Sequence, residues 1–97
     1  MTKQEAIERL VAHREELHAQ GVKSLALFGS VARGEAEQTS DVDVVVELNR
    51  PMSLFGLSDL KHVIQRILGA QNVDLITYDG IHPALKDVIL REIVHVI

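Results

Sequence analysis

The chain has 97 residues, of which 46% are apolar and 25% charged, and it contains no cysteine. This is the composition of an ordinary folded protein, and the length predicts one domain over residues 1–97. Disulfide bonds, thiolate metal sites and a cysteine nucleophile are excluded. No apolar run is long enough to cross a membrane and no apolar signal segment opens the chain, so we expect a cytoplasmic protein without a membrane partner.

The net charge of −4 is unevenly distributed. Residues 35–47 carry five acidic side chains and no basic one, whereas the segments on either side are close to neutral. A protein that grips nucleic acid through its phosphates needs a basic face, and none is visible, so we expect no direct nucleic-acid binding. The acidic segment fits either a solvated loop or a site for divalent cations.

The first elements in chain order are a helix and two strands. Thr2 opens a capping box, and the apolar residues that follow at helical spacing predict a helix ending near Gly21. The mostly apolar segment 22–28 predicts an internal strand. Residues 29–39 predict a loop with room for one helical turn, and residues 41–48 give the strongest strand signal in the chain.

The second half of the chain predicts two helices and one or two strands. Ser53 suits the cap of a helix that ends near Gly69, and residues 73–78 predict a third strand. Pro83 suits the first turn of a last helix, and residues 94–97 fit either a fourth short strand or the end of that helix. We expect the apolar side of the last helix to be buried, with Leu85, Val88, Ile89 and Ile93 on it. The fold class is therefore α/β (α+β), a mixed sheet of three to four strands flanked by helices.

Two carboxylates stand at the start of the strongest strand signal. Asp41 and Asp43 are two residues apart, so their side chains share one face, with Cα atoms about 6.5–7 Å apart. The pair fits either a site for one or two Mg²⁺ ions or a polar face of an edge strand. Asp74 is a lone acid in the apolar segment 73–78. If the strand with Asp74 pairs in register with the strand of Asp43, Asp74 completes a site suited to Mg²⁺ or Mn²⁺. If it does not, Asp74 lies on the solvent face of an edge strand.

A Gly-Ser pair, Gly29 and Ser30, ends the first predicted strand. A glycine lets the backbone approach a phosphate closely, and the following amides and the Ser30 hydroxyl can donate hydrogen bonds to it. Arg33, three residues after Ser30, could pair with phosphate oxygens. A Gly-Ser pair alone, however, indicates only a turn. Gly29 and Gly34 have the spacing of a Walker A loop, but Glu35 stands where the lysine must be, which excludes that motif.

These residues in combination resemble a known family. The Gly-Ser pair, ten intervening residues, the Asp41-x-Asp43 pair and the later Asp74 are similar to the nucleotidyltransferase superfamily of DNA polymerase β. In detail they resemble its minimal nucleotidyltransferase branch, and the resemblance covers nearly the whole chain. Each of these signals alone is weak, whereas their combination is specific.

The resemblance implies a role for each residue. By this resemblance, the metal-binding and catalytic residues would be Asp41, Asp43 and Asp74. They would hold two Mg²⁺ ions, or Mn²⁺ in their place, and Asp74 would also help to deprotonate the attacking hydroxyl. Gly29 and Ser30 would hold the β- and γ-phosphates of ATP, and Arg33 would contact phosphate or a partner.

Some members of this branch are antitoxins paired with RNA-cleaving HEPN-domain toxins. The resemblance therefore implies a Mg²⁺-dependent enzyme that transfers AMP from ATP to a tyrosine hydroxyl of such a toxin and silences it. Two alternatives stay open. The chain could neutralise its partner simply by covering it, or it could transfer a nucleotide to a small molecule or RNA.

The shortness of the chain bears on its partners. Aromatic residues make up only 3% of it, too few for a platform that stacks a base. We therefore expect weak nucleotide binding and an acceptor surface completed by a partner or a second copy, in a hetero-oligomer or a homodimer. Phe55 fits either a contact surface of this kind or an additional core position.

Overall fold

The computed structural model describes residues 1–34 and 41–97. The elements, in chain order, are α1 (Lys3–Ala12), α2 (Arg14–Ala19), β1 (Val22–Phe28), α3 (Gly29–Ala32), β2 (Val42–Leu48), α4 (Leu54–Leu68), β3 (Val73–Thr77), the 3-10 turn η1 (Tyr78–Gly80), α5 (Pro83–Glu92) and β4 (Val94–His95). None of the helices within those ranges has the length and apolarity that a membrane span requires.

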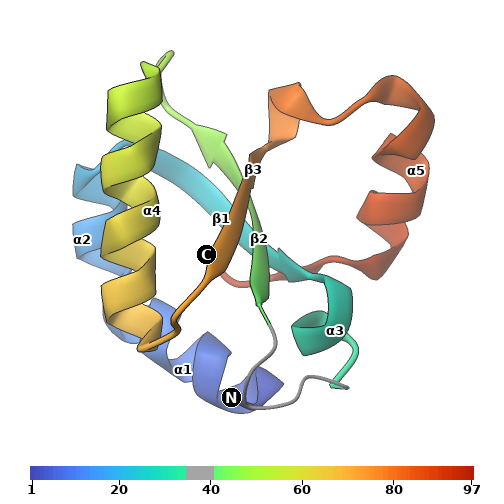
Figure 1. Ribbon diagram of the computed structural model, residues 1–97, viewed down its shortest axis with the longest axis horizontal. Coiled ribbons are helices and arrows are strands. Elements are labelled where there is room, and N and C mark those ends of the chain that lie inside the picture. Colours follow the sequence, from blue (N-terminus) through green and yellow to red (C-terminus); the bar gives the residue numbers. More distant parts are fainter. Residues whose placement is uncertain (35–40) are drawn as a thin grey trace.

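The four strands form one mixed sheet in the order β3-β2-β1-β4 (Figure 1). β1 runs antiparallel to β2 and to β4, whereas β2 and β3 are parallel. The strand β1 is therefore internal, as the apolar segment 22–28 predicted; β2 is internal as well, and β3 and β4 form the edges. This confirms the expected mixed sheet with flanking helices, and it places a fourth short strand near the end of the chain.

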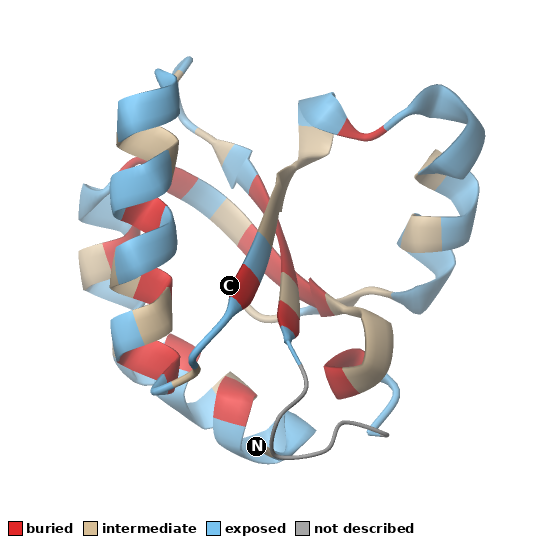
Figure 2. Cartoon of the chain, in the orientation of Figure 1, coloured by how far each residue is buried: buried red, intermediate tan, exposed pale blue. Residues whose placement is uncertain are grey.

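The main hydrophobic core lies between one face of the sheet and the helices α1, α2 and α4 (Figures 1 and 2). Its fully buried side chains include Leu10, Leu17, Leu25, Leu27, Val44, Val46, Leu60 and Ile64. Side chains alternate along a strand, so Val42, Val44 and Val46 of β2 face this core. Asp43 consequently points to the opposite face, on the side of α5 (Figure 1), whereas α3 lies at the end of β1 and contributes Val31 and Ala32 to the main core.

The helix ends follow their capping signals, with one exception. The Thr2 and Ser53 hydroxyls accept hydrogen bonds from the first turns of α1 and α4, and Gly69 ends α4 in the left-handed conformation, at φ +66°. The expectation of one continuous helix up to Gly21 is wrong, because the chain leaves the helix at His13. The His13 ring Nδ1 lies 2.8 Å from the Arg9 carbonyl oxygen, where the backbone N–H of a continuing helix would donate.

The last helix, α5, also departs from expectation, because its apolar side is not buried. Leu85 and Val88 are 53% and 54% exposed, Ile89 and Ile93 are only half-buried, and α5 contains no buried residue at all (Figure 2). The topology explains this. α5 leads from the β3 edge of the sheet to β4 at the other edge, and it stands apart from the helices that cover the core (Figure 1).

Candidate active site

The pairing of β1, β2 and β3 brings two predicted site residues side by side. Phe28 of β1 is the register partner of Asp43 in β2, and Asp43 is the register partner of Asp74 in β3. Register partners carry their side chains on the same face of a sheet, in strands about 4.8 Å apart. Asp43 and Asp74 therefore occupy neighbouring positions on the face opposite the main core, as the cation-site interpretation required.

The order of the strands distinguishes between the alternative interpretations of these acids. β2 is an internal strand, so the interpretation of the Asp41–Asp43 pair as part of an edge strand is wrong. Asp74 does lie in an edge strand and is exposed, yet it is also in register with Asp43. Asp41 is exposed and directly precedes β2. Glu35 and Glu37 of the acidic segment lie outside the described residues.

Gly29 connects the end of β1 to the short helix α3 and lies against Asp43. Its φ of +71° is a conformation that glycine adopts at little cost. A Cβ atom at this position would overlap the Asp43 carboxylate, with the carboxylate carbon Cγ only 3.1 Å away. The close approach of the backbone to Asp43 therefore requires glycine, and it places the Gly-Ser turn directly beside the acids.

Ser30 and Arg33 belong to the same turn. Ser30 is half-buried in α3, and Arg33 ends that helix, where its backbone N–H donates to the Gly29 carbonyl oxygen at 3.1 Å. The Arg33 guanidinium forms an ion pair with the Glu92 carboxylate at the end of α5, at 3.3 Å. Sequence reasoning did not identify Glu92, because an acid in the last turn of a helix carries no motif.

The electrostatics of the site centre on Asp43. The pKa of its carboxyl is raised, chiefly because burial removes water from the charged form. Asp74 and then Asp41 raise this pKa further by repulsion between like charges, whereas the positive charge of Arg33 acts in the opposite direction. Asp41, Asp74 and Arg33 thus lie close enough to Asp43 to act electrostatically on its carboxyl.

This set of groups fits a hard divalent cation. Carboxylate oxygens are the ligands that Mg²⁺ prefers, and a cation relieves the repulsion that raises the pKa of Asp43. Within residues 1–34 and 41–97, however, no three acidic or histidine side chains converge closely enough to hold one ion. The backbone therefore brings suitable ligands to one place, but the side chains would have to turn toward an ion to bind it.

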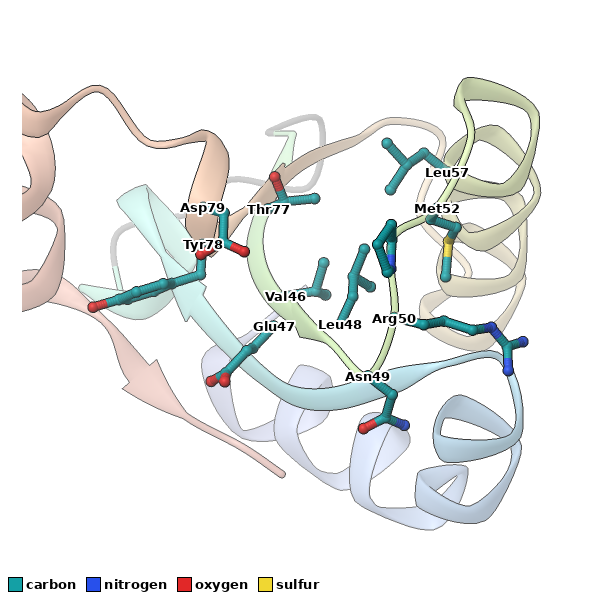
Figure 3. A pocket seen from close by; sticks show the side chains of 11 residues that line it. Val46, Glu47, Leu48, Asn49, Arg50, Met52, Leu57, Thr77, Tyr78 and Asp79 are labelled. Atoms are coloured by element: carbon teal, nitrogen blue, oxygen red, sulfur yellow. The ribbon is translucent and has the colours of Figure 1, made fainter.

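A cavity of about 400 Å³ lies elsewhere, at the other ends of β2 and β3 (Figure 3). It is bounded by the last residues of β2, by the turn into α4 with Met52 and Leu57, and by Thr77, Tyr78 and Asp79. None of the predicted site residues lines it. Asp43 and Asp74 lie near the starts of the two parallel strands, so the acids and this cavity are separate features.

Comparison with known proteins defines the class of this chain. Its sequence matches the nucleotidyltransferase domain family over residues 7–96, and it therefore belongs to that family. This confirms the resemblance found in the motifs and identifies the chain as an enzyme of the nucleotidyltransferase class.

Two relatives of this chain carry more specific names. The protein adenylyltransferase MntA of Thermococcus cleftensis is 35% identical over 97 residues, which cover 99% of this chain and 97% of that protein. A Methanocaldococcus jannaschii protein, named as a putative protein adenylyltransferase, is 48% identical over 77 residues, 79% of this chain and 82% of that protein.

Solved structures share the fold. One described as a putative minimal nucleotidyltransferase superposes with a TM-score of 0.73 at 34% identity, covering 97% of this chain and 95% of the other. A toxin–antitoxin complex with AMP-PNP contains a chain with a TM-score of 0.73 at 17% identity, covering 100% of this chain and 73% of that one. At that identity the likeness is one of fold.

Proposed function

We propose that this chain is a protein adenylyltransferase that acts as an antitoxin. It transfers AMP from ATP, with Mg²⁺, to a tyrosine hydroxyl of a HEPN-domain toxin, and residues 1–97 act as one catalytic domain. The observation that carries the proposal is the packing of Gly29 against Asp43, with Asp74 in register on the next strand. Two relatives named as adenylyltransferases support it, as does a structure of a tri-AMPylated Shewanella oneidensis HEPN toxin with an MNT antitoxin of the same fold.

The turn at Gly29 and Ser30 receives the triphosphate. Because residue 29 has no side chain, the backbone of the turn approaches Asp43 closely, which brings the amides that bind phosphate beside the carboxylates. The Ser30 hydroxyl and the amides of the turn donate hydrogen bonds to the β- and γ-phosphates. Arg33 adds positive charge at the end of the same turn, which favours the developing charge on the leaving pyrophosphate.

The carboxylates act at the α-phosphate. Asp41, Asp43 and Asp74 would hold Mg²⁺, which supplies neutralisation of the phosphate charge and lowers the pKa of a hydroxyl near it. A tyrosine hydroxyl has a pKa of about 10, so it needs a nearby base to react at neutral pH. Asp74 is the exposed carboxylate beside Asp43, so it accepts the proton as the hydroxyl attacks the α-phosphorus and pyrophosphate leaves.

The test is the intact mass of a cognate HEPN-domain protein after incubation with this chain, ATP and Mg²⁺. We expect a gain of one or more AMP units, lost in the double variant Asp41→Asn/Asp43→Asn. Glu47→Gln is the matched control, because Glu47 is an exposed acid of the same strand that pairs with Lys23 away from the site. Neutralisation of the toxin by the double variant without AMP transfer would instead establish a binding module. Labelling of RNA or a small molecule from ATP without the partner would establish a different acceptor.

A further inference from the structure

We infer that the exposed apolar side of α5 is the surface on which the protein acceptor docks beside the reaction centre. This inference rests on the proposed function and adds to it the surface that selects the acceptor. Leu85 and Val88 are both more than half exposed, and α5 buries none of its residues in the described part of the chain. A surface helix of this length usually buries its apolar side, so this exposure calls for a partner.

The orientation of this apolar side follows from the ion pair at the end of α5. Residues 85, 88 and 92 are spaced by three and by seven, so they lie on one side of the helix. Glu92, the last of them, pairs with Arg33 of the Gly-Ser turn. Leu85 and Val88 therefore lie on the same side of α5 as the ion pair with Arg33, next to the Gly-Ser turn.

The apolar side of α5 also lies within reach of any protein that the site modifies. Arg33 acts electrostatically on Asp43 and touches Glu92, so the end of α5 borders the reaction centre. Leu85 is seven residues from Glu92, which is about 10 Å along a helix. A standard interface covers about 800 Å² on each partner, a disc about 16 Å in radius. An acceptor bound at the reaction centre with an interface of this size can therefore extend onto this side of α5.

The chemistry of the surface favours a protein over the nucleobase of ATP. Leu85 and Val88 are aliphatic, one turn apart and on a convex helix, which suits an apolar helix or loop of a partner. A nucleobase is usually held by stacking on aromatic side chains, and α5 contains none.

The experiment compares two double variants that each remove an exposed apolar pair. Leu85→Asp/Val88→Asp changes the proposed surface, and Leu54→Asp/Phe55→Asp changes a pair that is 84% and 85% exposed at the start of α4. For each protein the measurements are the KM for ATP, the KM for the HEPN-domain acceptor, the Kd of the complex and the Tm. We expect the α5 variant to raise the acceptor KM and Kd at least tenfold, with the KM for ATP and the Tm unchanged. The α4 variant should match the wild type.

Several outcomes would overturn the inference. An equal rise of the acceptor KM and Kd in the α4 variant would show that any exposed apolar pair matters. A rise of only the KM for ATP in the α5 variant would show that α5 binds the base of ATP. If the α5 variant does not fold, Leu85→Ala/Val88→Ala gives the same comparison, because alanine maintains the helix. If the wild type binds the acceptor without modifying it, the proposed function fails, and the Kd values still decide whether α5 is the docking surface. If the wild type neither binds nor modifies it, both fail.

Discussion

Replacement of Gly29 by alanine separates the backbone requirement at this position from its contact with Asp43. Any non-glycine residue at φ +71° costs about 1 kcal/mol of strain, which lowers the Tm of a domain of this size by about 4–8 °C. The same strain arises in Gly69→Ala, where φ is +66° and the new Cβ would meet only the flexible Arg9 side chain, at 3.3 Å. The two variants should therefore lose similar stability.

They should differ greatly in activity. In Gly29→Ala the new methyl group overlaps the Asp43 carboxylate, which must move by about 1 Å, and a misplacement of that size costs about 100-fold in rate. The assay is the initial rate of AMP transfer to the acceptor, by intact mass, at a temperature where both variants are folded. Gly69→Ala should react within about twofold of the wild type. A Gly29→Ala protein that retains the wild-type rate after the same loss of Tm would refute the role of this contact.

Three further predictions concern stability. The folded-state pKa of Asp43 is raised, so the metal-free protein loses stability as the pH rises through that pKa, and Asp43→Asn should raise the Tm at pH 7. This gain in Tm should vanish below the ordinary Asp pKa of about 3.9. Melting curves over a pH series test this, and a gain in Tm that grows on acidification would contradict the raised pKa of Asp43. Leu27→Ala removes a fully buried side chain of an internal strand and should cost about 2–5 kcal/mol by urea unfolding, whereas Leu85→Ala, at an exposed position, should cost under about 0.5 kcal/mol. Ser53→Ala removes the hydrogen bond that caps α4 and should cost about 1 kcal/mol by the same method; no loss relative to Ser58→Ala would show that the cap contributes nothing.

Local signals predicted most of the fold, because caps, glycine stops and apolar periodicity act over a few residues. Thr2, Ser53 and Gly69 mark helix ends where expected. The break at His13 was missed, because it depends on a side chain that replaces a backbone donor. The sequence left open whether Asp74 lies beside Asp43, because the register of two strands separated by a helix is set by long-range pairing.

The exposure of α5 was missed for a different reason. An apolar stripe at helical spacing predicts that one side of a helix will be covered, but it does not say by which molecule. Leu85 and Val88 are at helical spacing in α5, as Leu60 and Ile64 are in α4, where the sheet covers them. The same local pattern is therefore covered in one helix and exposed in the other.

The way α5 is attached has a consequence for how such a protein can diversify. The chain enters α5 from one edge of the sheet and leaves it into β4 at the other, while the main core is built from residues outside this helix. Substitutions on the outer surface of α5 therefore leave the packing that stabilises the fold intact. Recognition of a new acceptor can be acquired there one residue at a time, without compensating changes in the sheet. Grafting the α5 residues of one relative onto another would be a direct way to exchange their acceptors.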